Sequence, residues 1–210
     1  MIDAALQPIM RRVLTPPARL LAAAGVGADG ITIAGFAIGL LVVPALAAGM
    51  PGIALCLILL NRLLDGLDGA VARIAGPTDR GAFIDITLDF AFYALVPVGF
   101  ALADPDANAL AAAVLIAAFV GTGSSFLAFA AVAARHGRTA TAFPTKGIHY
   151  LGGLTEGFET IVVFGAMCLI PAAFAGLAFV FSAACAVTTV LRWRQGWTAF
   201  AVPGQDRHSL

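Results

Sequence analysis

The stretch NRLLDGLDGAVARIAGPTDRGAFIDITLD, residues 61–89, holds five of the chain's twelve acidic residues within 25 positions. Asp65 and Asp68 are three residues apart, so they share one face of a helix. Asp85 and Asp89 are four residues apart and share a helix face in the same way. The stretch therefore predicts two helical segments that each present a pair of carboxylates.

Outside this stretch the chain is strongly apolar. Of its 210 residues, 60% are hydrophobic and 11% are charged. Soluble domains carry about 25% charged residues, so this chain could not cover a water-exposed surface. A disordered chain is excluded for the same reason. The net charge is zero, which gives no support to a nucleic-acid partner. The composition predicts an all-α integral membrane protein.

Six apolar runs are long enough to cross a membrane as helices. They occupy residues 31–49, 51–73, 82–103, 108–134, 149–170 and 172–193. With this count the basic flanking residues fall on one side, which predicts that both termini are cytoplasmic. An amphipathic pattern before the first run predicts an interfacial helix over residues 2–14 that ends at Pro16 and Pro17. We expect one domain over residues 1–210, with the interfacial helix and a linker at 1–25, the six-span bundle at 31–193 and a cytoplasmic tail at 197–210.

A hairpin folded at residues 74–80 would bring the four carboxylates to similar depths, because all lie about 6–12 Å from the loop at 1.5 Å rise per residue. Bare carboxylates at a helix centre cost roughly 2.5–3.5 kcal/mol each on insertion scales, and they repel one another. Arg62, Arg73 and Arg80 are too few to neutralise them. Bound cations remove both costs, and clustered oxygen ligands suit Mg²⁺, Mn²⁺ or Ca²⁺. Four carboxylates can hold two divalent ions, an arrangement used for phosphoryl displacement.

This stretch closely resembles the signature of the CDP-alcohol phosphotransferase (CDP-alcohol phosphatidyltransferase) family. The resemblance is carried by Asp65-x-x-Asp68-Gly69-x-x-Ala72-Arg73…Gly81-x-x-x-Asp85-x-x-x-Asp89. The family has eight residues between its Arg and its second Gly, whereas this chain has seven. The plan of six spans with an amphipathic N-terminal helix is also similar. Residues 146–159 resemble those of a poorly characterised bacterial inner-membrane subgroup.

The resemblance implies an enzyme of phospholipid biosynthesis in the cytoplasmic (inner) membrane of a bacterium. It would transfer a phosphatidyl group from CDP-diacylglycerol to a small alcohol and release CMP, with Mg²⁺ or Mn²⁺, in two ions, as cofactor. The implied metal ligands are Asp65, Asp68, Asp85 and Asp89, and Asp89 would also be the general base. The residues expected to bind the CDP-lipid are Asp29, Thr32, Gly66, Gly69, Ala72, Arg73, Thr78 and Gly81.

The acceptor site is expected among polar residues outside the signature. The candidates are Lys146, His149, Glu156, Glu159, Arg192 and Arg194. The basic residues would bind a phosphorylated acceptor, or they simply anchor the cytoplasmic ends of the spans. The two glutamates could bind hydroxyl groups, attract an amine or pair with Arg192. The sequence leaves a phosphorylated alcohol, a neutral polyol and an amino alcohol all open.

A cation transporter or channel, with the same acids as its ion path, is the alternative function. It is disfavoured because the first, fourth and sixth predicted spans contain no acidic residue. A transferase that acts on another CDP-linked donor is a second alternative. Glycines such as Gly35 and Gly39 permit close contacts between helices, either within one chain or across a homodimer.

Overall fold

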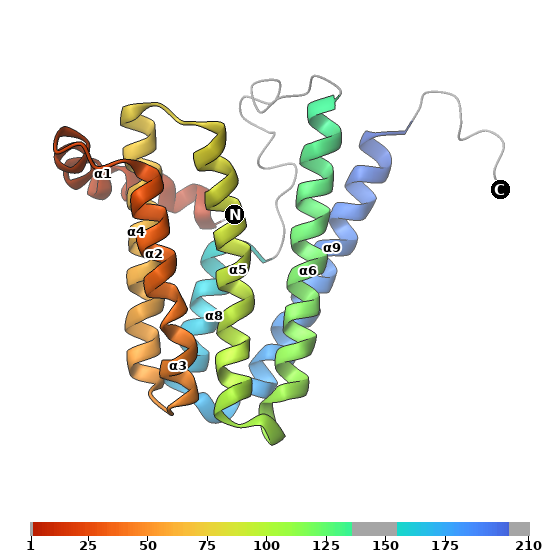
Figure 1. Cartoon of the computed structure of the whole chain (residues 1–210). Helices are drawn as coiled ribbons and strands as arrows, with labels where there is room; N and C mark the ends of the chain where they lie inside the picture. The colour runs from red at the N-terminus through yellow and green to blue at the C-terminus, as the bar shows by residue number, and fades with distance from the viewer. Residues whose placement is uncertain (1, 136–154, 202–210) are drawn as a thin grey trace.

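The computed structural model describes residues 2–135 and 155–201, and these residues form helices without any strand. Figure 1 labels the helices, which are α1 (Ile2–Ala23), α2 (Ala28–Leu40), α3 (Val42–Ala47), α4 (Pro51–Ala75), α5 (Asp79–Ala103), α6 (Pro105–Arg135), α8 (Gly157–Leu169), η2 (Pro171–Ala173) and α9 (Phe174–Ala199). The expected all-helical architecture is therefore confirmed for the described residues.

Among the described residues, four helical segments are long and apolar enough to cross a membrane. They are Ala28–Ala47, Asp79–Ala103, Pro105–Arg135 and Pro171–Ala199. The first combines α2 with α3, and the last combines η2 with α9. α4 has 25 residues but contains a cluster of charges, and α8 has 13 residues. The chain is thus a multi-pass membrane protein with four spans identified in its described part, and the count of six stays a prediction.

The first predicted span, residues 31–49, is not one continuous helix. It starts earlier, as α2, and breaks at Leu41, where the backbone N–H donates to Ile38 O at 3.1 Å in a tightened turn. Pro44 explains the break, because proline supplies no N–H to the carbonyl of Leu40 and its ring crowds that carbonyl. α3 then continues in nearly the same direction (Figure 1).

The last two predicted spans also differ from their expected bounds. Helix α8 begins at Gly157 rather than at residue 149, because Glu156 and Glu159 form a capping box that fixes the helix start. Residues 149–154 lie outside the described part of the chain. The span predicted at 172–193 continues as α9 to Ala199, beyond the start of the expected tail.

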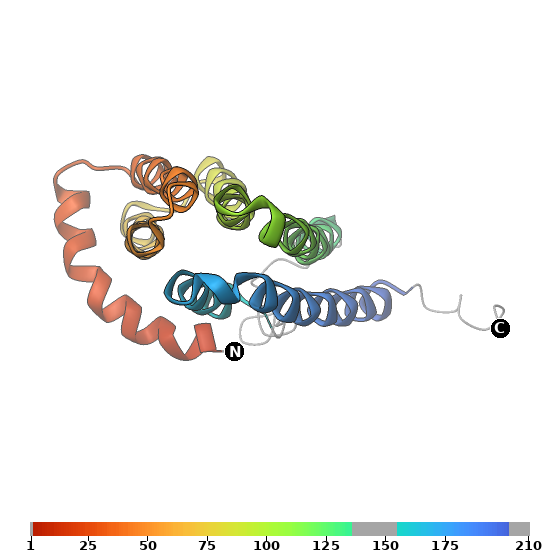
Figure 2. The ribbon, with the colours of Figure 1, turned by 90° about the horizontal axis from the view of Figure 1, so that it is seen from below.

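Helix α1 does not end at Pro16 and Pro17, as the sequence analysis expected, but runs through both. Prolines deprive the carbonyls of Arg12 and Val13 of their helical donors. Both of these residues are exposed, where water or lipid headgroups can bond to the freed carbonyls. α1 accordingly curves around the bundle (Figure 2). The error came from treating two exposed prolines as a helix end.

A small core holds α1 in place across the prolines. Leu14 and Ala18 are buried against Ile31 of α2 and against Ala70 and Val71 of α4. α1 therefore docks on the same end of α4 that carries the carboxylates. It lies across the bundle rather than along it (Figures 1 and 2).

The helix ends divide the bundle into two sides. The α4–α5 turn and the C-terminal ends of α6 and α9 lie together at the upper end in Figure 1, and the α3–α4 and α5–α6 turns lie at the opposite end. The upper end carries the basic residues Arg73, Arg80, Arg135, Arg192 and Arg194. This clustering is typical of the cytoplasmic side of a membrane protein.

The main core lies farther from the α4–α5 turn than the carboxylates do. It includes Phe92 on α5 and Leu46 on α3. Glycines let the helices approach there: a Cβ at Gly39 would lie 2.8 Å from Phe92 Cδ2, and one at Gly99 would lie 2.8 Å from Leu46 Cδ1. These close contacts are made within one chain.

Candidate active site

The turn between α4 and α5 sets the geometry of the site, because it holds the two helices as an antiparallel pair. α4 ends before Gly76, whose φ of +97° lies in the region that favours glycine, and Pro77 follows it. The hydroxyl of Thr78 then accepts a hydrogen bond from the Gly81 N–H at 3.0 Å and caps α5. One helix therefore ends and the next begins within three residues.

Three carboxylates converge from the facing sides of these helices. One oxygen atom from each of Asp65, Asp68 and Asp85 lies within 4.8 Å of the others. Asp68 is buried, and the other two are half-buried. Like charges this close repel one another unless a cation lies among them. The predicted convergence of α4 and α5 carboxylates is thus present for these three residues.

Asp68 gives the strongest sign that the cluster is built for a cation. Its Oδ2 atom is enclosed, and it accepts no hydrogen bond within the described part of the chain. An unsatisfied buried carboxylate oxygen is costly, so such atoms normally have a hydrogen-bond donor or a metal ion as partner. The donor set is made of carboxylate oxygens, which suits hard divalent ions. The residues present therefore fit Mg²⁺ or Mn²⁺.

A small cavity of about 10 Å³ opens onto all four carboxylates of the hairpin, and we call it the carboxylate cavity. Its lining includes Asp65, Asp68, Asp85, Asp89 and Thr32. A space of this size holds one water-sized group. The carboxylates therefore face a common space rather than separate surfaces.

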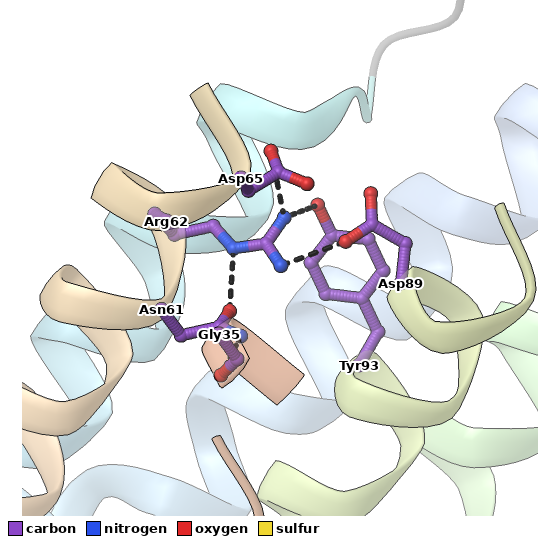
Figure 3. Close-up of polar contacts among 6 residues, drawn as sticks. All are labelled: Gly35, Asn61, Arg62, Asp65, Asp89 and Tyr93. Carbon is purple, nitrogen blue, oxygen red and sulfur yellow. Dashed lines mark hydrogen bonds and ion pairs between the residues drawn. The ribbon is translucent and has the colours of Figure 1, made fainter. Parts of the chain in front are cut away.

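Asp89 differs from the other carboxylates because a cation already contacts it. Arg62 Nη2 donates to Asp89 Oδ1 at 2.7 Å (Figure 3). The same guanidinium lies 3.5 Å from Asp65 Oδ2, measured from Nη1, and its Nη1 donates to the Tyr93 hydroxyl at 3.3 Å. Arg62 thus lies between the cluster of Asp65, Asp68 and Asp85 and the fourth carboxylate, which is Asp89.

The position of Arg62 is fixed by its other neighbours. Its Nε donates to Asn61 Oδ1 at 2.8 Å, and Asn61 Nδ2 donates to the Gly35 carbonyl at 2.9 Å (Figure 3). The guanidinium also lies over two aromatic rings, 4.9 Å from the centroid of Phe92 and 5.3 Å from that of Tyr93. These contacts hold the guanidinium in one orientation.

Sequence reasoning did not include Arg62 among the site residues. The signal was available, because Arg62 is the one basic residue well inside a predicted span and lies three residues before Asp65. An ionisable residue inside a membrane is by default a functional candidate.

The residues expected near the nucleotide gather at the start of α5. Arg80 donates to Asp29 Oδ2 from Nη2 at 2.6 Å and from Nε at 2.9 Å. A Cβ at Gly81 would lie 3.0 Å from Asp29 Oδ1 and 3.1 Å from Thr78 Oγ1, so these three residues are neighbours. Thr32, one helical turn after Asp29, lines the carboxylate cavity.

The remaining signature residues lie on α4. A Cβ at Gly69 would lie 3.4 Å from Arg73 Nη1, and no other atom of the described residues lies within 4 Å of it. Ala72 is half-buried beside them. Gly66 faces α1 instead, where a Cβ would lie 2.8 Å from Leu14 Cδ1. A larger residue at position 66 would therefore require the end of the Leu14 side chain to shift.

The candidate acceptor residues are dispersed. Glu156 and Arg192 line a second cavity, whereas the Glu159 carboxylate accepts a hydrogen bond from the Glu156 N–H at 3.2 Å and caps α8. Arg194 is exposed. Lys146 and His149 lie outside the described residues.

The second cavity has a volume of about 140 Å³ and lies between α5, α6, α8 and α9. We call it the aromatic cavity, and it is lined by Phe90, Tyr93, Phe119, Phe126, Glu156 and Arg192 together with three threonines, a glycine and a cysteine. Arg192 Nη1 donates to the Thr122 carbonyl at 3.0 Å, and its guanidinium carbon lies 5.8 Å from the centroid of the Phe126 ring. Tyr93 lines the aromatic cavity and accepts a hydrogen bond from Arg62, and Arg62 lines the carboxylate cavity.

Comparison with known proteins matches residues 26–199 to the model of the CDP-alcohol phosphatidyltransferase family. The inner membrane protein YnjF of Escherichia coli K12 is 54% identical over 197 residues, which cover 94% of this chain and 96% of YnjF.

Two solved structures of the Mycobacterium tuberculosis phosphatidylinositol phosphate synthase PgsA1 are also similar. The one with CDP-DAG bound is 24% identical, with a TM-score of 0.71 over 95% of this chain and 100% of that chain, a likeness of fold. The complex with manganese and citrate is 25% identical, with a TM-score of 0.64 over 93% of each chain.

Proposed function

The chain belongs to the CDP-alcohol phosphatidyltransferase family, and we propose that it transfers the phosphatidyl group of CDP-diacylglycerol to a small alcohol with release of CMP. The observation that carries this proposal is the carboxylate cluster, in which Asp65, Asp68 and Asp85 oxygens lie within 4.8 Å of one another. A fourth carboxylate, Asp89, lies beside it in the same cavity. A membrane location suits a donor whose acyl chains must stay in lipid.

We propose Asp65, Asp68, Asp85 and Asp89 as the ligands of two divalent ions, Mg²⁺ or Mn²⁺. The enclosed Oδ2 of Asp68 and the all-oxygen donor set support this assignment, as does the manganese complex of the M. tuberculosis relative. When bound, the ions would neutralise pyrophosphate charge and help CMP to leave.

The protein's own residues would hold the donor and move one proton. The residues that are proposed to surround the CDP group are Asp29, Thr32, Gly69, Ala72, Arg73, Thr78 and Gly81. Gly66 supports this part of α4 through its contact with α1. Asp89 would take the proton of the acceptor hydroxyl as general base. Arg62 would position Asp89, because it already binds one of the two carboxylate oxygens.

The membrane arrangement that accompanies this function has six spans. We propose that α4 is a span in spite of its charges, since its carboxylates face α5 and the carboxylate cavity. The chain segment that ends in α8 would form another span. Both termini and the basic helix ends would be cytoplasmic, with α1 at the interface and residues 1–210 as one domain. A homodimer stays a prediction.

A cation channel is not favoured. The carboxylates lie at the end of the bundle that holds the α4–α5 turn, and the opposite half is filled by the apolar core. Family membership also assigns the chain to transferases.

CMP release from CDP-diacylglycerol by the purified protein tests the function. We expect release to need Mg²⁺ or Mn²⁺ and an added alcohol, and to stop on chelation with EDTA. Asp68→Asn should abolish it by weakening metal-dependent CDP binding, whereas Asp106→Asn, an exposed residue at the start of α6, should not. Release that continues unchanged in EDTA or in Asp68→Asn would contradict the proposal. Other CDP-linked donors in the same assay test the alternative donor class.

A further inference from the structure

Arg62 carries an inference about the order in which the site binds its metal ions and its donor, and this inference rests on the proposed function. The carboxylate cavity is lined by Asp65, Asp68, Asp85 and Asp89, and Arg62 lines it as well. In their ionised forms the four carboxylates carry four negative charges, and Arg62 reduces this total to three. The site therefore contains one cation that belongs to the chain itself.

The positive charge of Arg62 is both permanent and fixed in place. A guanidinium stays protonated in proteins, so this charge is not lost as the pH changes. Its Nε donates to Asn61 Oδ1 at 2.8 Å, and the guanidinium carbon lies 4.9 Å from the centroid of the Phe92 ring. The Arg62 side chain is 15% exposed, so salt and water screen its charge less than they screen a surface charge. Any ion that enters the cavity therefore experiences this charge.

Arg62 contacts the four carboxylates unequally. One oxygen from each of Asp65, Asp68 and Asp85 lies within 4.8 Å of the others, and such a group suits one divalent ion. Asp89 Oδ1 instead accepts a hydrogen bond from Arg62 Nη2 at 2.7 Å (Figure 3). Asp65 Oδ2 also lies 3.5 Å from Arg62 Nη1. An ion bound through Asp89 would therefore have a like charge as its neighbour, which weakens its binding.

The charge of the site limits how many ions it can bind by itself. With Arg62 and the four carboxylates, one divalent ion leaves a single negative charge, and a second ion would make the site positive. The pyrophosphate of a CDP-lipid carries two negative charges, which would make the total negative again. Charges in a partly buried site interact several times more strongly than they do in water. The second ion and the donor should therefore favour each other's binding.

We propose that Arg62 makes the binding of the second divalent ion depend on the donor. The first ion binds to Asp65, Asp68 and Asp85 without a nucleotide. The second ion binds through Asp89, together with the pyrophosphate of the CDP-lipid. Coupling of this kind is reciprocal, so the second ion raises the affinity for the donor by the same factor. The two-ion site is then complete only when the donor is bound.

Manganese binding to the purified protein tests this proposal without relying on turnover. Electron paramagnetic resonance measures free Mn²⁺ and so counts the bound ions, with and without CDP-diacylglycerol in the detergent micelles. Micelles that contain the donor but no protein give the background. We expect the wild type to bind one Mn²⁺ tightly without the donor and a second one with it. In Arg62→Gln without the donor, the second ion should bind about 5- to 150-fold more tightly than in the wild type, the usual range of coupling between two ligands.

Matched variants separate the charge of Arg62 from its packing. Arg62→Lys keeps the charge and should keep the dependence of the second ion on the donor. Arg135→Gln, which removes an exposed basic residue at the end of α6, should bind Mn²⁺ as the wild type does. If Arg62→Gln fails to fold, Arg62→Met, which retains an apolar side chain over the Phe92 ring, replaces it. Equal second-ion affinity in the wild type and in the folded neutral variant would overturn the proposal.

The outcomes distinguish this inference from the function on which it rests. If the wild type binds two Mn²⁺ ions equally tightly without the donor, the proposed order is wrong and the transferase function stands. If only one ion binds even at saturating CDP-diacylglycerol, the proposed order is also wrong, because Arg62 would then replace the second ion permanently. If neither Mn²⁺ binding nor metal-dependent CMP release is observed, the transferase function itself is wrong.

Discussion

Asp89 and Asp68 have the same side chain but different surroundings, and this difference supports the additional role of general base that is proposed for Asp89. Asp68 is buried with one oxygen that has no hydrogen-bond donor in the described structure, as a metal ligand requires. Asp89 is half-buried and is bonded to Arg62 through one oxygen. The spacing of the signature predicted that these carboxylates would meet. It could not predict the Arg62 contact, because the direction of a long side chain depends on neighbours such as Phe92 and Asn61 that are distant in sequence.

Asp89→Asn should abolish transfer while binding of CDP-diacylglycerol persists. Asparagine keeps the size of the side chain and an oxygen that can accept the hydrogen bond from Arg62, but it cannot take a proton. Loss of a general base lowers the rate by about 10²–10⁴-fold. The measurement is kcat together with donor binding, and Asp106→Asn is the control. Near-normal turnover in Asp89→Asn would remove Asp89 from the role of base.

Arg62→Gln should lower kcat by about 10- to 150-fold, the usual cost of losing a hydrogen bond to a charged group. The KM for the donor should change less, because Arg62 contacts Asp89 and Asp65 rather than the residues proposed to hold the nucleotide. Arg62→Lys should restore part of kcat, since lysine returns the charge without the planar fork. If Arg62→Gln and the exposed control Arg135→Gln have the same kcat, Arg62 has no positioning role.

At the scale of the helices, the sequence was most informative where local signals agreed. The α4–α5 hairpin was predictable because acidic residues at helical spacing flank a segment that contains Gly76 and Pro77. The predicted end of α1 was wrong because the two prolines lie on the exposed side of this helix, where the helix tolerates them. The break at Leu41 was missed because Pro44 lies inside an apolar run. In both cases the tertiary environment of a proline decided whether it ended a helix.

The contact between α3 and α5 gives a prediction about stability. A Cβ at Gly99 would lie 2.8 Å from Leu46 Cδ1 and 3.3 Å from the backbone Cα of Val43, so Gly99→Ala must push α3 away from α5. Overpacking of this kind costs about 1–3 kcal/mol. The apparent Tm in detergent should fall. Gly176→Ala, where no atom of the described residues lies within 4 Å of the new Cβ, should leave the apparent Tm unchanged or raise it slightly. Equal Tm values would mean that these helices are not so closely packed.

The α4–α5 turn and the C-terminal ends of α6 and α9, which carry basic residues, lie at the same end of the bundle (Figure 1). The carboxylate cavity lies near the α4–α5 turn, and Arg73, Arg80 and Arg135 lie at helix ends on that side. In the proposed reaction, CMP would leave toward the side that holds the basic residues. The positions of the basic residues between the predicted spans predicted this orientation, but the closeness of Glu156 and Arg192 in the aromatic cavity needed the folded chain, since they are 36 positions apart.

The proposed orientation can be tested with reporters placed at both ends of one helix. α5 runs from Asp79 at the basic end to Ala103 at the opposite end, and Gly76 and Asp104 lie in the turns beside these ends. Basic residues stay on the cytoplasmic side of a membrane, so an alkaline phosphatase fused after Gly76 should be inactive and one fused after Asp104 should be active. A green fluorescent protein fused after residue 210 should fluoresce, because an even number of spans returns the C-terminus to the cytoplasm. An active phosphatase fused after Gly76 would show that the orientation is the reverse of the proposed one. An active phosphatase fused after residue 210 would show that the number of spans is odd, and this result would not contradict the proposed carboxylate site.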